Sequence, residues 1–151
     1  MQLAESSDSH SIASLYLASR KAHLPYAPLA HSDKAIYSWA ADVLIKTNRI
    51  IAASKDGELL GFIAMASDEG RQWINHLYIH PRHTGSGIGS ALLEYALAHM
   101  PRPVYLYTFQ ANTGARRFYE RYGFIAQEFN DGSGNEEGCP DVLYVLNPSS
   151  S

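Results

Sequence analysis

The sequence predicts an α/β fold with a mixed sheet that is antiparallel in its first part and parallel at its centre. Two segments near the N-terminus carry apolar residues at helical spacing. The middle of the chain then alternates short apolar runs with glycine-containing turns, which is typical of antiparallel strands. Between residues 72 and 109 a strand, a helix and a strand follow one another. This order predicts a parallel crossover.

The two N-terminal helices are expected to begin at polar caps. Asp8 or Ser9 can cap the first helix, in which Ile12, Leu15 and Tyr16 recur at helical spacing. Ser32 can cap the second helix. The predicted apolar face of that second helix consists of Ile36, Trp39, Ala40, Val43 and Leu44.

Three antiparallel strands are expected next. The apolar runs 50–53 and 59–65 flank a turn signal, Lys55-Asp56-Gly57, and predict a hairpin. A second turn, Asp68-Glu69-Gly70, leads into a strand over 72–79. Pro81 then ends this strand, because proline lacks the backbone donor that a strand uses.

The second half of the chain supplies two helices and three strands. A helix over 87–99 precedes a strand over 104–109, and Asn112 or Thr113 can cap a last helix that ends at Gly123. The apolar face of this last helix is formed by Ala115, Phe118, Tyr119 and Tyr122. Two further strands are expected at 124–129 and 142–146, joined by the polar loop 130–140.

The composition favours one domain that binds a small ligand. The chain has 151 residues and a formal net charge of -3, so we expect a single domain over residues 1–147, a disordered end at 148–151, and no nucleic acid or membrane partner. There is no apolar run of the about 18 residues that a membrane span requires, and no signal-peptide pattern, which predicts a cytoplasmic protein. The single cysteine, Cys139, can form neither an internal disulfide nor a cysteine-rich zinc site, so no metal is expected.

The glycine-rich segment between the predicted strand 72–79 and the following helix predicts an anion site. Gly85, Gly87 and Gly89 alternate there, so the backbone can turn several amides toward one point. A P-loop is excluded because the turn ends Gly89-Ser90-Ala91 without a lysine. A Rossmann fingerprint is disfavoured because Ser90 stands where its third glycine should be, three residues after Gly87. A purely structural turn remains an alternative.

Two motifs together resemble the GCN5-related N-acetyltransferase (GNAT) family. Thr84-Gly85-Ser86-Gly87-Ile88-Gly89 is similar to the family's pyrophosphate motif except at its first position, where the family has glutamine or arginine. The segment Asn112 to Phe124, with its Phe118-Tyr119-Glu120 and Gly123-Phe124, resembles the second family block. The resemblance covers roughly residues 50–146 and implies a centrally splayed sheet of six to seven strands with helices on both faces.

The resemblance implies that the protein binds acetyl-CoA (coenzyme A) as a cosubstrate and acetylates an amine. The strand backbone at Leu77, Tyr78 and Ile79 is expected to pair with the pantetheine arm. The helix residues Asn112, Ala115 and Tyr119 are expected to reach the cofactor. The pyrophosphate is expected to lie on the turn formed by Thr84, Gly85, Ser86, Gly87, Ile88, Gly89 and Ser90. Relatives often dimerise, so a homodimer is a further expectation.

Three residues are candidates for the chemistry. Tyr119 stands at the family position that protonates the departing thiolate. No glutamate occupies the strand before the turn, where Trp73 and Asn75 stand, so the expected proton acceptor is a water touching His76 or Tyr107. Strand alternation predicts that His76 faces away from Asn75 unless a bulge intervenes.

The acceptor is expected to bind between the N-terminal helices and the last hairpin. The candidate aromatic residues are Tyr26, His31, Tyr37 and Trp39, and the candidate acidic residues are Asp131, Glu136, Glu137 and Asp141. The absence of a carboxylate base leaves a second hypothesis open, an acyl-CoA-binding sensor or interaction module that has the same fold but lacks turnover.

Overall fold

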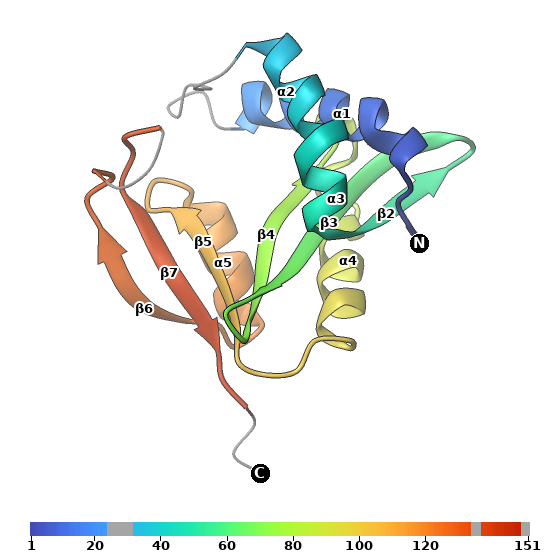
Figure 1. Cartoon of the computed structure of the whole chain (residues 1–151). Helices are drawn as coiled ribbons and strands as arrows, with labels where there is room; N and C mark the ends of the chain where they lie inside the picture. Colours follow the sequence, from blue (N-terminus) through green and yellow to red (C-terminus); the bar gives the residue numbers. More distant parts are fainter. Residues whose placement is uncertain (24–31, 134–136, 149–151) are drawn as a thin grey trace.

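A seven-stranded mixed sheet forms the centre of the molecule (Figure 1). The structure is a computed structural model, and it describes residues 1–23, 32–133 and 137–148. The strands lie in the order β1-β2-β3-β4-β5-β7-β6. The predicted fold class is confirmed. Their bounds are β1 Gln2–Leu3, β2 Arg49–Lys55, β3 Glu58–Asp68, β4 Arg71–Ile79, β5 Val104–Phe109, β6 Ile125–Asn130 and β7 Asp141–Leu146. The apolar pattern did not predict the two-residue strand β1, and residues 149–151 of the predicted disordered end lie outside the described residues.

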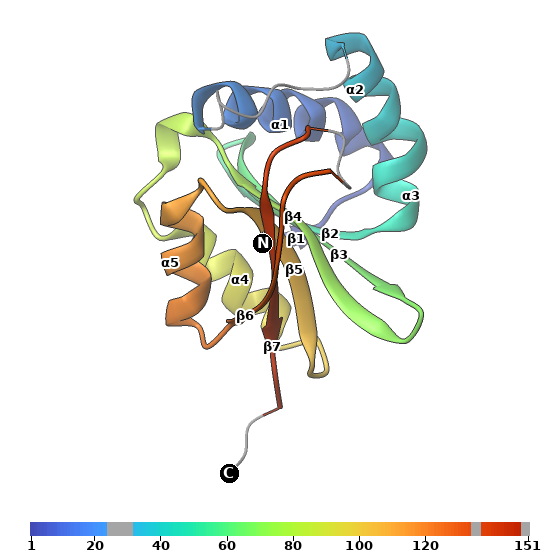
Figure 2. The same ribbon diagram turned by 90° about the vertical axis from the view of Figure 1, so that its left-hand side faces the viewer.

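Helices cover both faces of the sheet, as predicted. Figures 1 and 2 show α1, α2 and α3 on one side and α4 and α5 on the other. One buried cluster joins α1 and α2 to β2 and β3, and a second joins α4 and α5 to the sheet. The helix bounds are α1 Ser9–His23, α2 Asp33–Trp39, α3 Ile45–Thr47, α4 Ile88–Leu97 and α5 Thr113–Arg121. Within the described residues, no helix has the length and apolar character of a membrane span.

The helical backbone at the N-terminus begins earlier than predicted. A 3-10 turn over Ser6–Asp8 precedes α1, and Glu5 occupies the N-cap position. The backbone N–H of Glu5 donates to Asp8 Oδ2 at 2.8 Å. Asp8 therefore stabilises the first turn from its third position, and neither Asp8 nor Ser9 is the cap.

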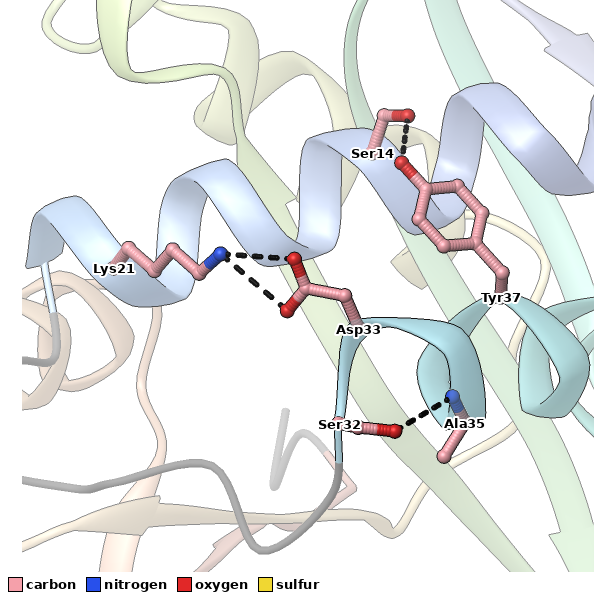
Figure 3. Close-up of polar contacts among 6 residues, drawn as sticks. All are labelled: Ser14, Lys21, Ser32, Asp33, Ala35 and Tyr37. Atoms are coloured by element: carbon pink, nitrogen blue, oxygen red, sulfur yellow. Dashed lines mark hydrogen bonds and ion pairs between the residues drawn. The ribbon is translucent and has the colours of Figure 1, made fainter.

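Polar contacts fix α2 beside α1 (Figure 3). The predicted cap is confirmed, because the N–H of Ala35 donates to Ser32 Oγ at 3.2 Å. Lys21 Nζ lies 3.2 Å from Asp33 Oδ2. Ser14 Oγ lies 2.6 Å from the hydroxyl of Tyr37.

The predicted apolar face of the second helix is correct except at Val43. A π-helical segment, Ala40–Leu44, lies between α2 and α3. The wider π turn changes the angular spacing of the side chains. Ala40 and Leu44 are buried, but Val43 is 45% exposed and does not share their face.

Two tight turns produce the antiparallel half of the sheet. Asp56 and Gly57 have φ values of 52° and 79°, and Glu69 and Gly70 have φ values of 51° and 78°. Two consecutive residues with positive φ match the right-handed twist of the strands that they connect. The hairpin β2–β3 and the hairpin β3–β4 are therefore specified by local sequence, as predicted.

The sheet splits between β4 and β5. These parallel strands pair only at Gln72↔Val104, Trp73↔Tyr105 and Ile74↔Leu106. On the other side of β4, Ala64 of β3 pairs with His76 while Met65 pairs with Ile74. Asn75 is thus the extra residue of a β-bulge, which bends β4 at the residue where its pairing with β5 ends.

Candidate functional site

A cleft of about 700 Å³ opens where β4 and β5 diverge. The cleft is a gap within the sheet, between β4 and β5. Consecutive residues of each strand therefore line it. Its strand walls consist of Ile74, Asn75, His76, Leu77 and Tyr78 of β4 and Leu106, Tyr107, Thr108 and Phe109 of β5. The helices contribute Tyr16, Arg20, Asn112, Ala115 and Tyr119, and the β6–β7 region contributes Asn130, Asp131, Gly132, Ser133, Glu137 and Asp141.

The β-bulge places both Asn75 and His76 on the cleft. Simple alternation puts them on opposite faces, but the extra residue at Asn75 breaks the alternation, and both line the cleft. Asn75 Nδ2 donates to Asn48 Oδ1 at 2.9 Å. His76 packs against the rings of Tyr16 and Trp39, with ring centroids 6.0 and 5.4 Å away.

The imidazole of His76 has a lowered pKa. Burial, and secondly the nearby positive charge of Arg20, lower its pKa from 6.5 to about 4. At neutral pH His76 is therefore uncharged. A general base works best with a pKa near the working pH, so His76 is a weaker proton acceptor than its unperturbed pKa implies.

The lowered pKa of His76 predicts a pH dependence of stability. The folded state binds this proton more weakly than the unfolded state, so the free energy of unfolding is expected to fall as the pH drops from 6.5 to about 4. His76→Phe keeps an aromatic ring but cannot titrate. Urea unfolding of both proteins across this range should show a shallower pH dependence in His76→Phe, and equal slopes would contradict the prediction.

Tyr119 lies in the cleft with its side chain buried. It is 8% exposed, and the rings of Phe118 and Phe124 lie with their centroids 5.2 and 5.7 Å from its own. Burial, and secondly the neighbouring Tyr78, raise the pKa of its hydroxyl well above the ordinary value of a tyrosine. The hydroxyl thus stays protonated at physiological pH, and it is a weaker acid than the hydroxyl of an ordinary tyrosine.

Arg20 is a cleft residue that the sequence analysis missed. Its side chain is 4% exposed, and Nη1 lies 3.5 Å from Glu137 Oε1. The guanidinium also lies over the rings of Tyr16 and Phe109, at 5.8 and 5.7 Å from their centroids. A signal was available, because Arg20 follows Ile12 and Tyr16 at intervals of four residues on the buried face of α1.

The β6–β7 loop closes one end of the cleft with acidic residues. Asp131, Glu137 and Asp141 line it, whereas Glu136 lies outside the described residues. The loop needs glycine at position 132, which has φ +92°, because a Cβ there would come within 2.5 Å of the carbonyl carbon of Cys139. At this close approach the backbone of Gly132 packs directly against that of Cys139.

The aromatic residues proposed for the acceptor have different positions. Trp39 packs behind the cleft wall, 5.3 Å from the ring of Tyr16 between centroids. Tyr37 is not among the residues that line the cleft and instead contacts Ser14 and the ring of His10. The hydrogen bond between Ser14 of α1 and Tyr37 of α2 holds the side chain of Tyr37 at this position. Tyr26 and His31 lie outside the described residues.

The glycine turn follows β4 and leads into α4. Gly85 and Gly87 have φ values of +79° and +85°, and a Cβ on either would meet no atom within 4 Å. Gly87 is the N-cap of α4. The N–H groups of the first turn of α4, residues 88–90, have no acceptor within the helix. The turn thus presents open backbone donors at the N-terminus of a helix.

The sequence-predicted cofactor residues separate into two groups. Leu77, Tyr78, Asn112, Ala115 and Tyr119 line the cleft, but none of residues 84–90 does. Ile79 lies beside the turn, since a Cβ on Gly89 would lie 3.8 Å from Ile79 Cγ1. Ile79 and the turn are not part of the wall of this cleft.

The polar side chains of the site do not gather into a metal centre. In the part of the chain that the structure describes, no group of three or more histidine, cysteine, aspartate or glutamate residues has the spacing to hold a metal ion.

Asn112 serves as the cap of α5 by accepting from the N–H of Ala115 at 3.2 Å. Gly123, with φ +95°, ends that helix, so both helix-end predictions are confirmed.

Comparisons with known proteins point to one family. The description "Acetyltransferase (GNAT) family" matches residues 14–124. A spermine/spermidine N(1)-acetyltransferase of Bacillus subtilis is 29% identical, over 46% of this chain and 54% of that protein. A peptidyl-lysine N-acetyltransferase of Escherichia coli is 36% identical, over 46% of this chain and 45% of that protein. The chain thus spans about half the length of these curated relatives.

Solved structures share the whole fold at low sequence identity. The PaiA N-acetyltransferase of Thermoplasma acidophilum, solved in complex with coenzyme A, has a TM-score of 0.74 at 20% identity, covering 98% of this chain and 100% of that one. The ribosomal-protein-S18-alanine N-acetyltransferase of Escherichia coli has a TM-score of 0.76 at 15% identity, covering 99% and 94%. At such identities the likeness is one of fold.

Proposed function

Because this chain belongs to the acetyltransferase (GNAT) family, we propose that it is an N-acetyltransferase that transfers an acetyl group from acetyl-CoA to an amine. One observation carries the proposal. The cleft between the diverging strands holds the buried hydroxyl of Tyr119, and the glycine turn with its open amides follows β4 beyond Ile79. A proton donor for the departing thiolate and a cradle for the anionic cofactor are two of the parts that this reaction uses.

The glycine turn suits the pyrophosphate of coenzyme A. The N–H groups of residues 85–90 and the dipole of α4 together favour a bound anion without a lysine. Thr84, which replaces the family's glutamine or arginine, retains its backbone N–H. Its hydroxyl donates to the carbonyl of Pro81 at 3.3 Å, which helps to hold the turn in shape.

The free edge of β4 suits the pantetheine arm. The ladder between β4 and β5 ends at Ile74 and Leu106, so the side of β4 toward β5 has no strand partner at Leu77 to Ile79. An extended chain with amide groups can pair with such an edge as an additional strand would. This arrangement directs the thioester toward Tyr119.

The chemistry follows from the groups in the cleft. Acetyl-CoA supplies the acetyl group as an activated thioester, and the neutral amine attacks its carbonyl carbon. A C–N bond forms, the C–S bond breaks, and Tyr119 donates its proton to the departing sulfur. The amine loses its proton to water in the cleft, where His76 accepts a hydrogen bond as a neutral imidazole and the hydroxyl of Tyr107 orders the water.

The acceptor is proposed to be a cationic primary amine. Asp131, Glu137 and Asp141 place three carboxylates on the cleft, Arg20 contributes the one guanidinium among the described lining residues, and His76 is neutral. The resulting negative potential attracts an ammonium ion. The names of the relatives, a spermine/spermidine acetyltransferase and a peptidyl-lysine acetyltransferase, fit this class of acceptor.

A thiol-release assay tests the function directly. Mixing the protein with acetyl-CoA and a panel of amines should release free coenzyme A, followed with a thiol reagent. The panel includes diamines, polyamines and lysine peptides. Acetyl-CoA binding without thiol release from any amine would contradict the enzyme assignment.

The second candidate is an acyl-CoA-binding module without turnover. It is favoured by two features of the cleft, namely the lack of a carboxylate on β4 and β5 and the low pKa of His76. This candidate predicts that coenzyme A raises the melting temperature while no amine is acetylated. If coenzyme A does not stabilise the protein at all, both candidates fail.

A further inference from the structure

The ring of Tyr107 has one covered face and one open face. It stacks on the indole of Trp73 with a centroid distance of 5.6 Å and an interplanar angle of 9°. The side chain is nevertheless 54% exposed and lines the cleft. The parallel rings are offset at this distance, so the indole lies against part of one face and the rest of the Tyr107 ring is open. The cleft therefore has a flat aromatic surface on its β5 wall.

Trp73 holds this surface in place. Its indole also packs against Tyr105, with ring centroids 5.3 Å apart, and Trp73 and Tyr105 are direct partners across β4 and β5. The pairing of the two strands ends one residue later, at Ile74. Tyr107 therefore projects at the point where the cleft begins to open, and it is supported from behind by a rigid ring.

The charges around this surface favour a cation. Asp131, Glu137 and Asp141 line the same cleft, and Arg20 is the one guanidinium among its described lining residues. Cations already lie on rings nearby, since Arg71 is 5.0 Å from the centroid of Tyr105 and Arg20 is 5.7 Å from that of Phe109. A positive group on the open face of an aromatic ring is attracted by the electrons of the ring.

We propose that the open face of Tyr107, backed by Trp73, binds a second positive charge of the acceptor, so that the preferred acceptors are linear aliphatic diamines or polyamines. This proposal rests on the proposed function and adds a specificity-determining residue to it. One ammonium group loses its proton and attacks the thioester, and the other remains charged over Tyr107. The ring binds the second charge, whereas the hydroxyl of Tyr107 is not needed for that step.

Three acceptors of equal chain length test the proposal by steady-state kinetics. They are 1,6-diaminohexane, 6-amino-1-hexanol and 6-aminohexanoate, whose far ends are positive, neutral and negative. The wild-type protein should prefer them in that order. Tyr107→Leu should lower the ratio of kcat/KM for the diamine over the amino alcohol about fivefold, mainly through KM.

Three further variants separate the role of the Tyr107 ring from that of its hydroxyl and its surroundings. Tyr107→Phe should keep the wild-type ratio, because the ratio cancels any effect of the hydroxyl on the chemical step. Tyr95→Leu removes a tyrosine that is 41% exposed on α4 and does not line the cleft, and it should also keep the ratio. Trp73→Leu should reduce the preference for the diamine, because it removes the support behind Tyr107.

Three results would overturn the proposal while leaving acetyl transfer intact. The first is equal use of the diamine and the amino alcohol by the wild-type protein. The second is a wild-type ratio in Tyr107→Leu. The third is a ratio lowered equally in Tyr107→Phe, which would assign recognition to the hydroxyl. Failure of the proposed function is a separate result, in which no amine of any charge releases thiol.

Discussion

Replacing Tyr119 by phenylalanine is expected to lower kcat for acetyl transfer by about 10² to 10⁴-fold, the range that a positioned general acid contributes. The substitution removes only the hydroxyl, so the affinity for coenzyme A should change little. The physical reason is that the departing thiolate loses its proton donor in a buried site. Because the pKa of Tyr119 is raised, the wild-type protein should show no loss of activity from this group at pH 9.

Tyr122→Phe is a matched control for this prediction. Tyr122 lies three residues after Tyr119, at the C-cap of α5. Its hydroxyl donates to Glu94 Oε1 at 3.0 Å, and its side chain does not line the cleft. Both variants lose one phenolic oxygen, and only Tyr119→Phe should lose turnover in the thiol-release assay. A kcat for Tyr119→Phe within about threefold of wild type would show that another group protonates the sulfur.

Replacing Gly85 by alanine is expected to raise the dissociation constant for coenzyme A at least about tenfold. One reason is that the amide donors of the turn must form charge-assisted hydrogen bonds with the pyrophosphate, each worth about 1.5–3 kcal/mol. The other is that alanine disfavours the left-handed backbone at φ +79°, which displaces those donors. Isothermal titration calorimetry with coenzyme A measures the change.

The chain offers a close control in Gly57→Ala. Gly57 also has φ +79° and open space around its missing Cβ, but it lies in the β2–β3 turn. Both variants should lose similar stability toward urea, about 1–2 kcal/mol, because the cost of the left-handed conformation is the same. Only Gly85→Ala should lose affinity. Equal affinities in the two variants would place the pyrophosphate elsewhere.

Local features of the chain were predictable because their causes lie within a few residues. Asp56-Gly57 and Glu69-Gly70 specify hairpin turns through their backbone preferences, and Asn112 caps α5 through a contact three residues away. The glycine turn and the crossover around it likewise follow from short-range order. These features were sufficient to predict the mixed sheet and the presence of Tyr119 on α5, whereas the helices on both faces were expected from the family resemblance.

The shape of the cleft was only partly predictable. The resemblance implied a splayed sheet, but the bulge at Asn75 is visible only as a register shift against β3. Similarly, the π segment that exposes Val43 depends on how the second helix packs against its neighbours. Bulges and π turns arise from competition between long-range contacts, and such competition leaves no signal in local spacing.

The sequence by itself determined the order of the elements and the place of the glycine turn, and it predicted the anion site and the candidate proton donor. Only the tertiary structure decided how the cleft is charged and what its walls present. Arg20 of α1 meets Glu137 of the β6–β7 loop, and burial with Arg20 lowers the pKa of His76. Trp73 stacks on Tyr107 across two strands. These properties depend on distances between residues far apart in the chain, and such distances exist only once the chain has folded.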